Sequence, residues 1–151
     1  MAPQKITPFL WFDTQAEEAA KFYVSLFKDS EIRRVVPGPT GAPMIVEFEL
    51  AGASYIALNG GPHFKLTEAF SLSVSCADQS EIDELWEKLS AGGAQSQCGW
   101  LTDRFGLSWQ IVPAALSKLM SDPERSGRVM QALMQMTKIE IQKLQDAFDH
   151  A

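Results

Sequence analysis

Two amphipathic helical segments of the same pattern, 63 positions apart, constrain the fold of this chain more than any other feature. The matching pairs are Phe22 with Leu85, Tyr23 with Trp86 and Leu26 with Leu89. Apolar residues at this i, i+1, i+4 spacing lie on one face of a helix. Each segment also follows a strand-like run, so the pattern predicts a duplicated module rather than a solenoid of short repeats.

Alternating apolar and polar residues predict strands on both sides of each helical segment. The predicted strands are 6–12, 32–36, 46–50, 55–58, 70–75, 96–101 and 107–112. The first half therefore has the order β-α-β-β-β, and the second half begins in the same way. Together with the matched helices, this predicts two β-α-β-β-β modules in an α+β fold whose strands form a cupped mixed sheet. We expect one domain over residues 1–151, made of module one (5–62), module two (68–113) and a helical tail (114–151).

Capping boxes predict where several of these helices begin, because each side chain of such a pair can bond the other's backbone N–H. The candidate pairs are Thr14 with Glu17, Asp78 with Glu81 or Ser80 with Asp83, and Thr137 with Glu140.

Composition argues against several classes of partner. The net charge is −6, and no basic patch accompanies the four tryptophans, so we expect no nucleic-acid partner. No apolar run is long enough to span a bilayer, and the first residues lack the layout of a secretion signal. Cys76 and Cys98 match neither a zinc pattern nor a redox pair, which favours a reduced, cytoplasmic protein.

Residues 102–112, TDRFGLSWQIV, predict a tight turn that leads into a strand. Leu107, Trp109 and Ile111 alternate with Ser108 and Gln110, so we expect the apolar residues to face the helices and the polar pair to face the other way. Asp103 and Arg104 are interpreted as a surface turn with an exposed ion pair.

The duplicated order resembles the vicinal-oxygen-chelate superfamily, which includes glyoxalase I and the bleomycin-resistance proteins. The motifs LWFDTQAEEAAKFY, ALNGGPHF and TDRFGLSWQI resemble its PhnB-like branch, whose members are often called 3-demethylubiquinone-9 3-methyltransferases. The resemblance covers residues 6–112 and implies the cupped fold. It also implies a homodimer, because the superfamily usually pairs its modules within or between chains.

Enzymes of this superfamily hold a divalent metal with His, Glu or Gln from the first and last strands of each module. The resemblance places one such position at Gln110. It places the others near Pro8, near Ala57 and at 69–71, and a shift of one residue offers only Thr7, Phe9, Leu58 or Phe70. None of these is a histidine or a carboxylate, so we expect no tightly bound metal and no cofactor. The chain also lacks the glycine-rich strand-to-helix turn that would cradle a nucleotide-like cofactor for methyl transfer.

The candidate ligand-binding residues are small polar side chains and one tryptophan that would line the cup: Asn59, Ser71, Ser73, Trp100, Ser108 and Gln110. Ser75, Tyr55 and Ala57 are expected on the same inner surface, and Glu47 with Glu49 would give it an acidic side or form a solvated face. No residue is assigned as catalytic. Binding of a small organic molecule, a metal-dependent enzyme of the glyoxalase or dioxygenase type, and the methyltransferase activity of the family label remain the alternatives.

Overall fold

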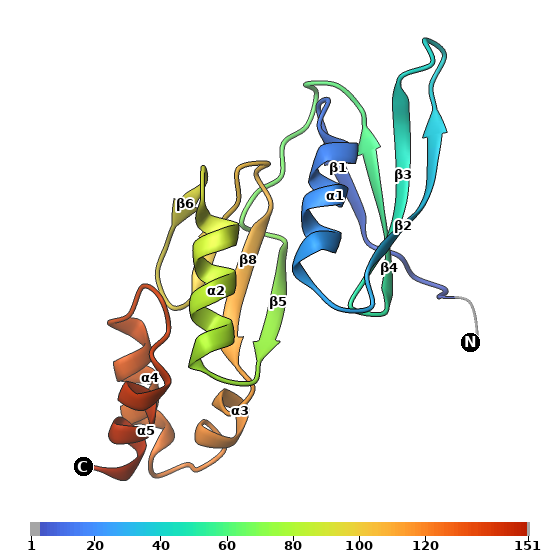
Figure 1. Ribbon diagram of the computed structural model, residues 1–151. Coiled ribbons are helices and arrows are strands. Elements are labelled where there is room, and N and C mark those ends of the chain that lie inside the picture. The colour runs from blue at the N-terminus through green and yellow to red at the C-terminus, as the bar shows by residue number, and fades with distance from the viewer. Residues whose placement is uncertain (1–3, 151) are drawn as a thin grey trace. The chain divides into compact units, whose positions relative to one another are not determined.

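A computed structural model describes residues 4–150 of the chain, which divides into two compact units between Leu66 and Thr67 (Figure 1). Each unit contains a four-stranded sheet of mixed direction and a helix that follows its first strand. The predicted duplication of β-α-β-β-β modules is therefore confirmed. No helix within residues 4–150 is long and apolar enough to cross a membrane.

The first unit consists of β1 (Phe9–Phe12), α1 (Ala16–Leu26), β2 (Glu31–Pro37), β3 (Pro43–Leu50) and β4 (Ala53–Asn59). Its strand order is β1-β4-β3-β2, with β1 parallel to β4 and the other pairs antiparallel. One sheet face packs against α1. The buried core on that face includes Leu10, Tyr23, Val46, Phe48 and Ala57, all at most 1% exposed.

The second unit begins with β5 (Ser71–Cys76), α2 (Gln79–Ser90), β6 (Ala94–Gln95), β7 (Trp100–Thr102) and β8 (Ser108–Pro113). Its order is β5-β8-β7-β6, and β5 is again parallel to the last strand of its module. All four predicted apolar residues of α2 are buried: Ile82, Leu85, Trp86 and Leu89. The periodicity of this helix therefore identified its buried face correctly.

The helical tail belongs to the second unit and comprises α3 (Leu116–Leu119), α4 (Ser126–Met134) and α5 (Ile141–Asp149). Its buried core is Leu119, Val129, Leu133, Met136, Ile139 and Leu144. The segment between α4 and α5 is hydrogen-bonded to the β6–β7 turn, where Cys98 N and Gly99 N donate to the carbonyls of Met136 and Thr137, both at 2.8 Å. The tail is thus attached to its module by backbone hydrogen bonds as well as by apolar contacts.

Two of the predicted capping boxes are wrong. Helix α1 begins at Ala16 without a cap from Thr14, and Asn59 on β4 supplies the acceptor for Ala16 N at 2.8 Å. Helix α5 begins at Ile141, whose N–H donates to the side chain of Gln79 at 2.7 Å. Only the α2 cap is local, where the Asp78 carboxylate accepts from Glu81 N at 2.9 Å. An acceptor brought in by the tertiary fold satisfies the same N–H group as a local cap.

Candidate functional site

A buried carboxylate shapes the turn that leads into β8. Asp103 is 2% exposed and accepts hydrogen bonds from Phe105 N at 2.8 Å, Leu107 N at 3.1 Å and the indole Nε1 of Trp109 at 2.8 Å. The expectation of an exposed Asp103 is therefore wrong. Arg104 next to it is exposed, and its guanidinium lies 4.5 Å from the centre of the Phe105 ring.

The side chains of β8, which follows this turn, alternate between the side of the sheet covered by α2 and the opposite side. Leu107, Trp109 and Ile111 are at most 1% exposed and lie on the covered side, as predicted. Ser108 and Gln110 alternate with them and lie on the opposite side.

Strands β5 and β7, which flank β8, add further polar residues to the side of the sheet that carries Ser108 and Gln110. We call this surface the polar face. Ser71 pairs with Ser108, and Ser73 pairs with Gln110 on the parallel strand β5. On β7, Trp100 pairs with Gln110 and Thr102 pairs with Ser108. Because paired residues project to the same side of a sheet, the polar face consists of Ser71, Ser73, Ser75, Trp100, Thr102, Ser108 and Gln110. Thr102 was not predicted on this face, although its position two residues after Trp100 on the same strand indicates it.

One hydrogen bond connects the two parallel strands across the polar face. The Gln110 side chain donates from Nε2 to Ser71 Oγ at 3.0 Å. Ser108 is only 1% exposed, Ser71, Trp100 and Gln110 are half-buried, and Ser73 is exposed. Solvent exposure on the polar face therefore increases from the buried hydroxyl of Ser108 to the accessible hydroxyl of Ser73.

Asn59 does not lie on this face. It ends β4 in the first unit, where its carboxamide accepts from Ala16 N at 2.8 Å and donates to the Pro43 carbonyl at 3.0 Å. The predicted orientation of β4 is wrong: Ala57 is fully buried, and the Tyr55 ring stacks on the buried Phe48 ring with centroids 5.5 Å apart. Burial raises the pKa of the Tyr55 hydroxyl. Strand β4 has this orientation because Ala57 pairs with Leu10 and Val46, which both face α1.

The opposite face of the first sheet carries an ion-pair ladder. Glu47 bonds Arg34 at 2.6 Å, and Glu49 bonds Arg33 at 2.6 Å. The expected acidic side is therefore largely neutralised. The two arginines were missed because a register shift between Ile32 and Arg34 hides the pairing from the sequence.

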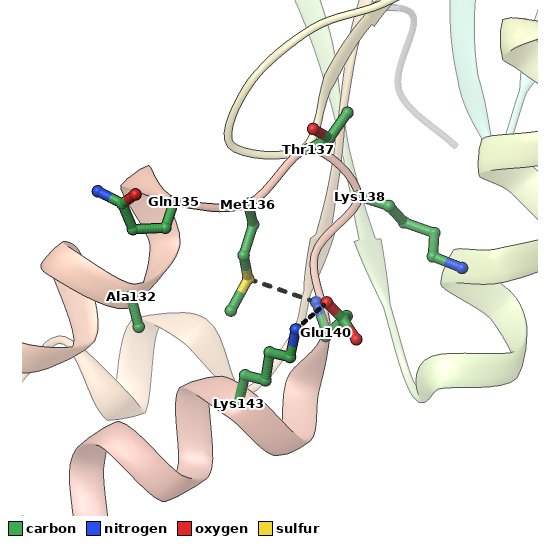
Figure 2. A pocket seen from close by; sticks show the side chains of 7 residues that line it. All are labelled: Ala132, Gln135, Met136, Thr137, Lys138, Glu140 and Lys143. Atoms are coloured by element: carbon green, nitrogen blue, oxygen red, sulfur yellow. Dashed lines mark hydrogen bonds and ion pairs between the residues drawn. The ribbon is translucent and has the colours of Figure 1, made fainter.

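A cavity of about 420 Å³ lies in the tail between the end of α4 and the start of α5 (Figure 2). It is lined by Ala132, Gln135, Met136, Thr137, Lys138, Glu140 and Lys143. Its charges are already paired, Lys143 with Glu140 at 2.9 Å and Lys138 with Asp83 at 2.8 Å. The Met136 sulfur accepts from Glu140 N at 3.5 Å. We interpret this cavity as a groove between packed elements.

Cys76 is not an activated nucleophile. Burial, together with the nearby carboxylates of Glu81 and Asp78, raises the pKa of the Cys76 thiol to about 12. Cys98 is free and half-buried at the β6–β7 turn.

Comparison with known proteins identifies the family. The sequence profile of the family described as 3-demethylubiquinone-9 3-methyltransferase matches residues 4–112. The chain belongs to this family. A structure of a Bacillus cereus protein given this description, PhnB, is 36% identical, with 74% of this chain and 100% of that chain covered and a TM-score of 0.69. None of the curated proteins compared with the chain matches it.

The fold extends to more distant proteins. The fosfomycin resistance protein FosX of Listeria monocytogenes is 15% identical over 81% of this chain and 100% of that chain, with a TM-score of 0.59. A second FosX structure, complexed with Mn(II) and sulfate, is 16% identical over 74% and 92% of the two chains, with a TM-score of 0.54. The likeness to FosX concerns the fold, and the chain is a PhnB-like member of the vicinal-oxygen-chelate superfamily.

The polar face does not fit the divalent metal found in that FosX complex. It offers one carboxamide and several neutral hydroxyls, whereas a hard cation needs several carboxylate or imidazole ligands. Among residues 4–150, no three His, Cys, Asp or Glu side chains come together as ligands. His63 is exposed in the loop after β4, in the first unit. The donor set is suited to hydrogen bonding with a neutral or polar organic molecule.

Proposed function

We propose that the polar face binds a small organic molecule through hydrogen bonds, without a tightly bound metal. The observation that carries this proposal is the placement of Ser71, Ser73, Ser108 and Gln110 on one side of two paired strands. A sheet face intended for a sealed core would carry Val or Leu, because each buried hydroxyl without a partner costs about 1–3 kcal/mol.

The hydrogen-bonding capacity of the face is only partly used. Gln110 donates to Ser71, but among the described residues its carbonyl oxygen accepts no hydrogen bond and the Ser73 hydroxyl has no partner. These groups can accept from and donate to a ligand. The half-buried Trp100 beside Gln110 adds a flat apolar surface, so the best ligand is a molecule with a planar part and a polar edge.

Asn59 is not part of this proposal. Its carboxamide is committed to the start of α1 and to the Pro43 carbonyl. The binding residues we propose are therefore Ser71, Ser73, Trp100, Ser108 and Gln110, all of which belong to the second unit.

A thermal-shift screen of metabolites and antibiotics, run with and without Mn²⁺, tests the proposal. Stabilisation without metal that is weakened by Gln110→Ala and by Ser73→Leu supports it. The matched controls are Gln131→Ala and Ser117→Leu, which change exposed residues of the tail. Hits that appear only with Mn²⁺, or turnover of a hit only with Mn²⁺, would favour the metal-dependent enzyme. If no ligand stabilises the protein and Ser73→Leu raises the melting temperature, the face has no binding role.

We also propose that the protein is a homodimer. Met130 and Met134 on α4 are 40% and 60% exposed, and Phe9 on β1 is 54% exposed, which is more apolar surface than these short elements need. A two-fold contact is the commonest arrangement for soluble chains. Light scattering at micromolar concentration checks this, and a monomer mass there would contradict it.

A further inference from the structure

The sequence contains a single asparagine, Asn59, and a glycine follows it. An asparagine before a glycine is the dipeptide most prone to deamidation, because the glycine nitrogen is unhindered and the flexible glycine backbone lets it reach the preceding carboxamide. Asn59 ends β4, and Gly60 begins the loop that follows. The structure of the first unit explains why each of these two residues is needed at its position.

Gly60 is required because the Trp11 ring occupies the space that a side chain would fill. A Cβ added at Gly60 would overlap this ring, with Trp11 Cη2 only 2.8 Å away. The ring is held by a hydrogen bond from its Nε1 to the Gly61 carbonyl at 2.9 Å and by the edge contact with the Phe64 ring, whose centroid lies 4.9 Å away. A ring anchored in this way makes no room for a larger residue, so glycine is the residue that fits.

Asn59 is required because its carboxamide links β4 to two other elements. Its oxygen accepts from Ala16 N at the start of α1 at 2.8 Å, and its nitrogen donates to the Pro43 carbonyl at the start of β3 at 3.0 Å. An ionised aspartate could accept but not donate, and an aliphatic residue could do neither. Packing and hydrogen bonding together therefore place a chemically reactive dipeptide at the end of β4.

The same contacts oppose the reaction in the folded chain. Deamidation begins when the Gly60 nitrogen attacks Cγ of the Asn59 side chain. The Gly60 N–H, however, donates to the Phe12 carbonyl at 2.8 Å, and the carboxamide is held by α1 and β3. These hydrogen bonds must break before the two groups can meet, which requires a local opening that separates the end of β4 from its neighbours.

We propose that Asn59 is a deamidation site that the fold keeps closed and that reacts when the end of β4 separates from α1 and β3. The Gly60 nitrogen forms a bond to Cγ and the bond from Cγ to Nδ2 breaks, so that ammonia leaves with the Gly60 amide proton. Water then opens the cyclic imide at either of its carbonyls, which gives aspartate or isoaspartate. The net reaction exchanges one water for one ammonia.

The two products affect the first unit differently. Aspartate retains an acceptor for Ala16 N and loses only the donor to the Pro43 carbonyl. Isoaspartate carries the chain through its side-chain carboxyl and so adds one backbone carbon before Gly60, which displaces Gly60 from the Phe12 carbonyl and from the Trp11 ring. Formation of isoaspartate therefore makes a transient opening of the first unit permanent.

Intact mass and peptide mapping of the full chain test the proposal, and the mass gain is assigned readily because Asn59 is the only asparagine. The folded chain and the chain in guanidinium chloride are incubated in the same mildly alkaline buffer. We expect the folded chain to deamidate at least roughly tenfold more slowly, because the opening is rare. Equal rates, or no conversion in guanidinium chloride, would overturn the proposal.

Two alanine-to-glycine variants locate the opening. Ala20→Gly in α1 loosens the helix that holds the Asn59 carboxamide and should raise the deamidation rate of the folded chain roughly fivefold, the effect of one glycine in a helix interior. The matched control Ala132→Gly, in α4 of the second unit, should leave the rate unchanged. Equal acceleration by both variants, or by neither, would exclude opening of the first unit as the controlling step.

Refolding of the converted chains tests the effect of each product. Aspartate and isoaspartate chains formed in guanidinium chloride are separated and refolded, and hydrogen exchange at Ala16 N is measured. We expect this amide to be protected in the aspartate chains and unprotected in the isoaspartate chains. Protection in both fractions, or in neither, would contradict the assigned difference between the products.

Discussion

The Asp103 carboxylate accepts a hydrogen bond from the Trp109 indole at 2.8 Å, and both residues are at most 2% exposed. The same carboxylate bonds two backbone N–H groups of the turn before β8. The Asp103 side chain therefore links the turn to the covered side of β8. Because side chains alternate along the strand, fixing Trp109 on the covered side also fixes Gln110 on the opposite side.

Replacing Asp103 should strongly destabilise the protein. Asp103→Ala leaves three buried donors without this acceptor, and we expect a loss of about 3 kcal/mol in the free energy of unfolding. Urea unfolding measures it, with Asp13→Ala as a control at an exposed position. Equal midpoints for the two variants would show that the buried hydrogen bonds contribute little.

Asn59→Ala should destabilise the first unit by about 1–2 kcal/mol, because Ala16 N loses its acceptor and the Pro43 carbonyl loses its donor. Asn59→Asp retains an acceptor for Ala16 N and should lose less. Thermal unfolding compares the two. A ligand of the polar face should bind both variants like the parent chain; weaker binding would place Asn59 in the binding site.

Alanine substitutions at two glycines with positive φ distinguish the cost of backbone strain from the cost of a steric clash. Gly106 has φ 95° and no atom within 4 Å of an added Cβ, whereas at Gly99, with φ 84°, the added Cβ would lie 2.7 Å from Ile139 Cδ1 and 2.9 Å from the Ile111 carbonyl oxygen. Gly106→Ala should cost about 1 kcal/mol from strain. Gly99→Ala should cost at least about 1 kcal/mol more, because it also displaces the tail. Chemical denaturation of both variants decides this, and equal losses would contradict it.

Asp83 should make the docking of the tail sensitive to acid. Hydrogen bonds from Lys138 and Gln79 lower the pKa of its carboxyl below the ordinary value of 3.8. A carboxyl whose pKa is lowered on folding stabilises the folded state above its unfolded pKa, and this stabilisation is lost as the pH falls through the folded value. The melting temperature of the parent chain should exceed that of Asp83→Asn at pH 7, and the gap should close toward pH 2. A gap that persists in acid would exclude the ionised carboxylate as its source.

The duplicated order of elements and the covered sides of α2 and β8 could be predicted from the amino-acid sequence alone. These features depend on periodicity, which each segment carries locally: Leu107, Trp109 and Ile111 alternate, and Ile82, Leu85 and Leu89 recur at helical spacing. The polar face follows directly, because residues between buried ones in a strand must point the other way.

The hydrogen-bond partners of the backbone N–H groups at the helix ends depend on long-range contacts of the folded chain. The acceptor for Ala16 N comes from Asn59, 43 residues away, and the acceptor for Ile141 N comes from Gln79, 62 residues away, whereas local pairing favoured Thr14 and Thr137. The orientation of β4 was misjudged because Ile56 and Leu58, which alternate with Tyr55, Ala57 and Asn59, are the more hydrophobic residues and favoured the opposite side as the covered one. Packing of Ala57 against the side covered by α1 determines the observed orientation. The ion-pair ladder of the first sheet depends on a β-bulge at Arg33, and a bulge is set by the pairing of two strands rather than by either strand alone.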